Sequence, residues 1–202
     1  MRAFEKEING IHRLRIPFDT VETSVFLIEA DGKKILVDSA TTSEDVNGYI
    51  VPALYERGYS LRDIDMLVLT HRHGDHAGGC GRITELAPNI QVVTDVRELA
   101  TNISTYAMPG HTEDCIGVMD VRTHTLISGD GLQGAGVDKY RCYTQNPEFY
   151  LETIKKIEND ERIENILFSH AYEPWNSYRA IGREAVNFCL SECKKYVKEK
   201  VK

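Results

Sequence analysis

Six residues in the first half of the chain bring together side chains that bind metal ions. Residues 71–76 read His-Arg-His-Gly-Asp-His, which places three histidines and one aspartate within one hexapeptide. Imidazole nitrogens suit zinc, iron and other first-row metals, and a carboxylate suits the harder ions of that range. A single histidine is more often an ordinary surface or core residue, but this density of donors is typical of a metal site. The hexapeptide by itself indicates no substrate.

The residues on either side of the hexapeptide predict how it is positioned. The apolar run 66–69 predicts a strand that delivers the donors to one end of a sheet. Gly74 is expected to let the backbone turn tightly, so that the side chains before and after it converge. Gly78 and Gly79 are expected to let the next helix, predicted over 77–87, begin close to the donors.

Three further donors, His111, Asp130 and His170, each follow the end of another predicted strand. Strands that end on one edge of a layered sheet bring the residues after them together in space. We therefore expect these three residues to join the hexapeptide at one site. Two other histidines, His12 in a predicted strand and His124 in a predicted turn, are interpreted as structural residues.

The rest of the chain alternates between strand and helix patterns. Asn9-Gly10 and Asp31-Gly32 predict hairpin turns, so the first third of the chain is expected to form an antiparallel meander. A helix is expected to begin near Thr42 and end near Gly58, with a break at Pro52. Further helices are expected at about 95–100, at 147–158 and from about 178 to the end of the chain.

This order of elements predicts an α/β fold, a four-layer αββα sandwich of two mixed β-sheets with helices outside. The chain has 202 residues, of which 42% are hydrophobic and 27% charged, so residues 1–202 are expected to form a single domain with a substantial core. Five cysteines, an odd number without paired spacing, fit reduced thiols.

Charge and hydropathy exclude several classes of protein. The net charge of −7 argues against nucleic-acid and membrane-surface binding. The sequence has no apolar run of about 18 residues, which a transmembrane helix needs. Its first residues lack the apolar core of a signal peptide. We therefore expect a cytoplasmic protein without a nucleic-acid or membrane partner.

The run His71-x-His73-x-Asp75-His76, together with Pro-Gly-His111, Ser-Gly-Asp130 and Ser-His170, resembles the metallo-β-lactamase superfamily. The resemblance covers nearly the whole chain and implies a binuclear site with two divalent metal ions, zinc before iron or manganese. It implies that the first ion is held by His71, His73 and His111. It also implies that Asp75, His76 and His170 hold the second ion, that Asp130 bridges both, and that Asp38 supports the ligand loop.

This resemblance implies a metal-dependent hydrolase. A metal-bound hydroxide would attack an ester, thioester, lactone, amide or phosphodiester bond, because bound divalent ions lower the pKa of water to about 7. Asp75 and Asp130 are the expected catalytic carboxylates, and Asp75 would guide a proton toward the leaving group. Two alternatives remain open. One is a mononuclear iron dioxygenase of the persulfide dioxygenase type, with iron on His71, His111 and Asp130, and the other is a non-catalytic metal-dependent binding module.

Departures from the family pattern locate the substrate region. The Asp130 carboxylate is absent from true β-lactamases and indicates the glyoxalase II and lactonase side of the superfamily. Gln133 stands where the lactonases have a tyrosine, and the segment between His76 and His111 is short for the family. A homodimer, in which one subunit covers the cleft of the other, fits that short segment. In the loop 131–146, Lys139, Tyr140, Arg141 or Tyr143 is expected to line the mouth of the substrate site and to bind an anionic group.

Overall fold

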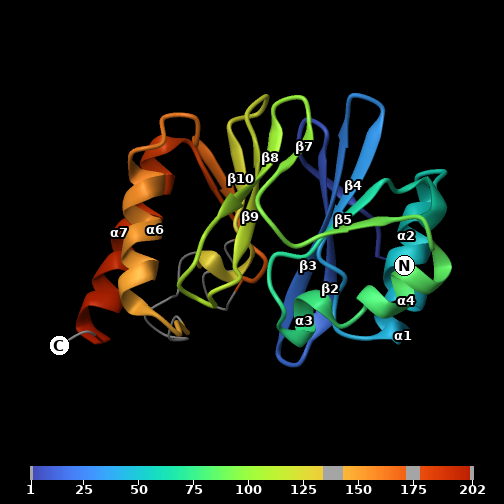
Figure 1. Ribbon diagram of the computed structural model, residues 1–202, viewed down its shortest axis with the longest axis horizontal. Helices are drawn as coiled ribbons and strands as arrows, with labels where there is room; N and C mark the ends of the chain where they lie inside the picture. The colour runs from blue at the N-terminus through green and yellow to red at the C-terminus, as the bar shows by residue number, and fades with distance from the viewer. Residues whose placement is uncertain (1, 134–142, 172–177, 201–202) are drawn as a thin grey trace. The chain divides into compact units, whose positions relative to one another are not determined.

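The computed structural model describes residues 2–133, 143–171 and 178–200 (Figure 1). Its contacts divide the chain into two compact units, Met1–Thr94 and Asp95–Lys202. Each unit contains one six-stranded mixed sheet and a hydrophobic core of its own. The prediction that residues 1–202 form a single domain stays a prediction.

The sheet of the first unit begins as an antiparallel meander and ends in parallel strands. Gly10 (φ 76°) lies in the first hairpin turn, and Asp31 (φ 50°) and Gly32 (φ 76°) have the positive φ angles of a primed two-residue turn, as predicted. The last three strands run parallel to one another. Across the sheet the order is β1 (Glu5–Ile8), β2 (Ile11–Phe18), β3 (Val21–Ala30), β4 (Lys33–Val37), β5 (Met66–Val68) and β6 (Gln91–Val93).

Short helices cover the apolar face of this sheet. At the expected break, a π-helical turn (Val46–Ile50) precedes the next helix. Pro52 lies in the first turn of that helix, where a proline is tolerated although it has no N–H group. The helix predicted over 77–87 is two helices, one of which starts at Gly74. The helical elements of this unit are α1 (Ser43–Asp45), η1 (Val46–Ile50), α2 (Val51–Glu56), η2 (Leu61–Asp63), α3 (Gly74–Ala77) and α4 (Cys80–Leu86).

The second unit packs two long helices against its sheet. Strands β8, β10 and β11 run in one direction, since β8 and β10 are both antiparallel to β9 while β10 and β11 are parallel. Figure 1 shows α6 (Pro147–Glu158) and α7 (Arg183–Lys200) side by side. Across the sheet the order is β7 (Glu98–Ala100), β8 (Ile103–Ala107), β9 (Ile116–Asp120), β10 (Thr125–Ile127), β11 (Asn165–Leu167) and β12 (Arg179–Ile181).

Two predictions of local structure are wrong, both at the edges of the second sheet. The short helix expected at about 95–100 is instead strand β7, which pairs with β8. The last helix begins at Arg183 rather than near 178, because residues 179–181 form β12 and pair with β11. Both segments are short, so pairing with a neighbouring strand outweighs their weak helical pattern. Among the described residues, no helix combines the length and apolar character needed to cross a bilayer.

A polar cluster ties the end of α2 to the first sheet. Glu29 on β3 accepts hydrogen bonds from Arg57, at the end of α2, and from the Tyr59 hydroxyl, at 2.5 and 2.7 Å. His12 on β2 is buried, with its Nε2 2.9 Å from Glu29. Burial lowers the pKa of His12, the Arg57 charge lowers it further, and Glu29 opposes both. His12 is therefore a structural residue of the first unit, as the sequence predicts.

This cluster predicts a pH-dependent stability. Because the pKa of His12 is lower in the folded than in the unfolded chain, the unfolded chain binds more protons as the pH falls below about 6.5. The stability that His12 contributes is present above that pH and is lost on acidification. The wild type should therefore lose more stability than His12→Gln between pH 7.5 and 5.5, measured as the midpoint of urea unfolding. His124→Gln, which removes an exposed turn histidine, is the matched control and should lose as much stability as the wild type. If the urea midpoint changed equally between the two pH values in the wild type and in His12→Gln, the assignment would be contradicted.

Candidate metal-binding site

The donors of the first unit follow the carboxyl end of β5. Strands β4, β5 and β6 are parallel, so the residues after each of them lie at one edge of the sheet. Asp38 follows β4 there, and the loop to His71 follows β5. The parallel pairing extends past the strand ends, because the amide of Asp38 donates to the carbonyl of Val68 at 2.8 Å and that of Leu69 to Val93 at 3.0 Å.

The Asp38 carboxylate organises this loop. It is fully buried and accepts hydrogen bonds from the Thr70 amide at 2.8 Å and the Thr70 hydroxyl at 3.0 Å. Its Oδ2 also lies 2.7 Å from Nδ1 of His76. The Thr70 hydroxyl is 3.2 Å from Nδ1 of His71. One buried carboxylate thus orients His76 directly and is linked to His71 through Thr70.

These contacts determine which nitrogen of His76 can bind a metal ion. A carboxylate only accepts, so Nδ1 carries the hydrogen toward Asp38 and Nε2 of the neutral imidazole is an acceptor. That Nε2 faces another acceptor, Oδ2 of Asp75, at 3.3 Å. A cation beside them satisfies both atoms, which makes the pair a fitting set of ligands. The rings of His71 and His73 lie next to them, with centroids 4.2 Å (His71 to His76) and 4.6 Å (His71 to His73) apart.

The backbone of the hexapeptide is held from two sides. The amide and the hydroxyl of Ser39 donate to the carbonyl of His76 at 2.7 and 2.8 Å. The hydroxyl of Thr23, which is buried on β3, donates to the carbonyl of Asp75 at 3.1 Å. Sequence analysis missed Thr23, Ser39 and Thr70 as supporting residues. Only Thr70 carries a signal, its position directly before His71.

Two of the three glycines near the donors have the predicted role. A Cβ on Gly78 would lie 1.9 Å from the carbonyl oxygen of Thr41, and one on Gly79 would lie 2.1 Å from that of Ser39. The segment 39–41, which follows β4, therefore approaches the backbone between α3 and α4 closely at these two glycines. The side chains before and after Gly74 converge as expected, with the rings of His71 and His76 4.2 Å apart, but Gly74 opens α3 and a Cβ there would meet nothing within 4 Å, so this position does not require a glycine.

The donors of the second unit also meet at one edge of a sheet. His111, Asp130 and His170 follow β8, β10 and β11, whose common direction puts their carboxyl ends together. The Asp130 carboxylate lies between the two imidazoles, with Oδ2 3.6 Å from Nε2 of His111 and Oδ1 3.3 Å from Nε2 of His170. The structure therefore brings together the three donors that the sequence singled out in this half.

His111 is oriented by backbone groups rather than by a carboxylate. Its Nδ1 is 2.9 Å from the carbonyl oxygen of Tyr143, which accepts the ring hydrogen and leaves Nε2 as the acceptor that faces Asp130. Gly110 (φ 141°) packs so closely on Tyr150 of α6 that a Cβ would lie 2.5 Å from it. The Thr144 hydroxyl donates to the Gly110 carbonyl at 2.7 Å. The pairing of imidazole and carboxylate acceptors found in the first unit is thus repeated here.

The predicted substrate residues are only partly described. Lys139, Tyr140 and Arg141 lie outside the described residues. The side chain of Tyr143 is half exposed, and its ring is edge-on to that of His111 at a centroid distance of 5.4 Å. Tyr143 therefore lies beside a donor, and its role in the substrate region stays a prediction.

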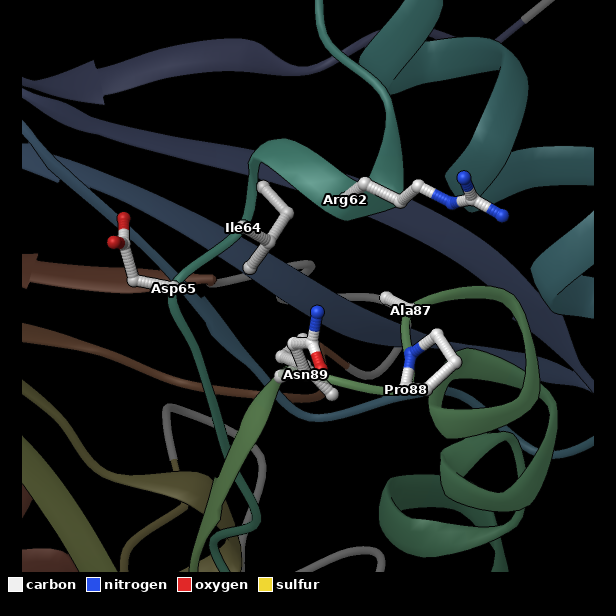
Figure 2. Close-up of a pocket in the computed structure, with 7 residues that line it drawn as sticks. Arg62, Ile64, Asp65, Ala87, Pro88 and Asn89 are labelled. Atoms are coloured by element: carbon white, nitrogen blue, oxygen red, sulfur yellow. The ribbon is translucent and has the colours of Figure 1, made fainter.

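A separate cavity of about 590 Å³ lies at the amino ends of β5 and β6 (Figure 2). Figure 2 shows the side chains of Arg62 and Asp65 extending away from each other at its rim. The carboxylate of Asp65 accepts a hydrogen bond from the Lys34 amide at 2.8 Å. Because the donors of this unit follow the opposite, carboxyl ends of the strands, this cavity is not part of the candidate metal-binding site.

The glycine contacts predict a sharp contrast between two substitutions in neighbouring turns. Gly78→Ala should destabilise the protein by about 3 kcal/mol or more and lower its metal content, since the added methyl group meets backbone atoms that cannot move aside. Gly81→Ala, in α4 with open space around it, should be neutral or stabilise by about 0.5–1 kcal/mol. Urea unfolding and elemental analysis of both variants test this. Similar values for the two would show that the close approach at Gly78 is wrong.

Comparison with known proteins relates this geometry to a family. Residues 19–102 match the model of the metallo-beta-lactamase superfamily. The Beta-lactamase-like protein 2 homolog of Caenorhabditis elegans is 28% identical over 165 residues, which cover 71% of this chain and 54% of that protein. An atrochrysone carboxyl ACP thioesterase of Pseudocercospora fijiensis is 26% identical over 130 residues, 56% of this chain and 38% of that protein. A hydroxyacylglutathione hydrolase of Stenotrophomonas maltophilia is 25% identical over 182 residues, 75% of this chain and 65% of that protein.

The chain spans about half the length of the first of these relatives. Among solved structures, that of TMB-1 superposes with a TM-score of 0.77 at 14% identity, over 100% of this chain and 99% of that one. This likeness confirms the predicted α/β fold with two mixed sheets. The sequence of residues 19–102 thus resembles the metallo-beta-lactamase superfamily, and the fold of the chain resembles that of the solved structure of TMB-1.

Proposed function

We propose that this protein is a binuclear metal-dependent hydrolase whose donor residues would bind two divalent metal ions. The observation that carries the proposal is the same in both sets. In each set, a histidine whose Nδ1 is bonded to another acceptor has its Nε2 3.3 to 3.6 Å from a carboxylate oxygen, so that in the neutral ring two acceptors face each other. Because zinc prefers imidazole and carboxylate ligands, zinc is the first choice, before iron or manganese.

The proposed ligands follow the family pattern. His71, His73 and His111 would hold the first ion, Asp75, His76 and His170 the second, and Asp130 both. Two such ions would lower the pKa of a water molecule to about 7 and polarise the substrate oxygen.

The chain's own residues orient this chemistry. Asp38 and the Tyr143 carbonyl each take the Nδ1 hydrogen of one histidine and so direct its Nε2 toward the carboxylates. The Asp75 side chain is 13% exposed, so it is within reach of solvent and could pass a proton to a leaving group. Tyr143 would line the substrate region through its half-exposed ring.

The substrate proposed is a small molecule with an ester, thioester, lactone, amide or phosphodiester bond. A thioester is the first class to test, because relatives of this chain are named a hydroxyacylglutathione hydrolase and an ACP thioesterase. A cytoplasmic location and a homodimer remain part of the proposal, and neither nucleic acid nor a membrane is a proposed partner.

Metal content and turnover of matched variants test the proposal. The purified protein should contain two zinc ions per chain by elemental analysis, and it should hydrolyse at least one member of a thioester, lactone and phosphodiester panel. Asp130→Asn, which keeps the shape of the side chain, should lower metal affinity and turnover at least about 100-fold, at or beyond the upper end for residues that only support a ligand. Asp95→Asn, at an exposed carboxylate paired with Arg97, is the control and should behave as wild type.

Three outcomes would contradict the hydrolase. One is a chain that binds no metal, and another is turnover that survives removal of the metal by a chelator. The third is a single ferrous ion with oxygen uptake in the presence of a persulfide, which would establish the dioxygenase instead.

A further inference from the structure

Two thiols on the last helix contact one carbonyl in the second unit. Cys189 and Cys193 are four residues apart on α7, so they share one face of the helix. Both are buried. Their Sγ atoms lie 2.9 Å and 3.4 Å from the backbone oxygen of Gln133. A carbonyl oxygen has two lone pairs, so it can accept both thiol hydrogens at once.

Gln133 lies at the end of the segment that carries Asp130. The segment starts at Ser128, whose amide donates to the carbonyl of Leu167 at 3.0 Å. It continues through the short 3-10 helix η3 (Gly129–Gly131), with the Gly131 amide bonded to Ser128 at 3.1 Å. A Cβ on Gly131 would lie 3.0 Å from the terminal methyl carbon of Met108, so this turn packs against that side chain. β11 therefore holds one end of the segment, and the thiol pair holds the other.

Among the described residues, the hydrogen bonds to the Gln133 carbonyl come from these two thiols. Leu132 is packed in the apolar core with residues of α6 and α7. This apolar packing restrains the segment, but, unlike a hydrogen bond, it does not fix the orientation of a backbone group. The Gln133 side chain is buried, and its Oε1 has no hydrogen-bond partner among the described residues. A buried carbonyl without a partner is costly, so the two thiol hydrogen bonds stabilise the Gln133 backbone in this position.

We propose that Cys189 and Cys193 are positioning residues, which hold Gln133 and thereby keep the Asp130 carboxylate between His111 and His170. The inference rests on the proposed function, because it concerns the carboxylate that would bridge the two ions. It makes α7 part of the support of the metal site. The two cysteines act through the backbone and need touch neither metal nor substrate.

A set of variants separates hydrogen bonding from packing. Cys189→Ala with Cys193→Ala removes both donors and should weaken zinc binding about tenfold, the lower end of the range for residues that orient ligands. Replacing both by serine keeps a donor at each position and should restore affinity to within about threefold of wild type. Leu190→Ala, on the same helix and fully buried, removes packing but no hydrogen bond, so it should lower the unfolding temperature while leaving zinc affinity unchanged.

Zinc affinity is measured by competition with a chromogenic chelator, and the coordination geometry by the visible absorption of the cobalt-substituted protein. The double alanine variant should shift the cobalt spectrum, and Leu190→Ala should not. If the double variant does not fold, Cys189→Ala alone leaves one donor and should produce a smaller shift in the same direction.

Wild-type affinity and an unchanged spectrum in the alanine variants would overturn the positioning role while leaving the hydrolase intact. Serine variants that bind zinc as weakly as the alanine variants would overturn it too, because packing alone would then explain the effect. A wild-type protein that binds no metal would instead overturn the proposed function itself, so the two failures are distinguishable.

Discussion

The hydrogen bond between the Asp38 carboxylate and Nδ1 of His76 is the interaction on which the first donor set depends. Asp38 is fully buried, and the described hydrogen bonds of its carboxylate go to Thr70 and His76, which follow β5. A buried charge is costly unless several donors surround it, and here two groups of Thr70 and one of His76 do so. The same bonds that make the carboxylate tolerable in the interior decide which nitrogen of His76 faces the metal side.

In the second donor set, a histidine is oriented by a neutral group instead of a carboxylate. A backbone carbonyl, that of Tyr143, takes the place of the carboxylate and orients His111. That carbonyl belongs to a segment that is itself bonded to the Gly110 turn through Thr144. The thiol pair on α7 continues this pattern, since it also acts on a backbone oxygen. In this unit the support of the donors is therefore largely a matter of backbone hydrogen bonds and close packing against the two long helices.

Strand direction explains why donors so far apart in the sequence meet within each unit. In the first sheet β4 and β5 are parallel, and in the second sheet β8, β10 and β11 share one direction. Every donor and Asp38 follow the carboxyl end of such a strand, which is where open sheets containing parallel strands place their ligands. The amino ends of β5 and β6 carry a cavity but no comparable set of donors among its lining residues.

Much of this molecule follows from local sequence. The hexapeptide, the three later donors and the two hairpin turns are visible as residue types at short spacing, because their chemistry or their positive φ angles depend on one or two residues. The edge strands β7 and β12 are not visible in the sequence, because segments of three residues acquire their structure from the strand with which they pair. Position 74 does not require a glycine, whereas positions 78 and 79 do. What distinguishes them is a backbone carbonyl from a remote part of the sequence, which lies close to positions 78 and 79 in the folded chain.

The same limit applies to the supporting residues. Thr23, Ser39, Cys189 and Cys193 have no local signal, because each acts on a backbone group that lies between 37 and 60 residues away in the chain. The sequence by itself thus determined which side chains can bind a metal ion. The tertiary structure alone decided what orients them, because hydrogen bonds over such separations exist only once the chain has folded.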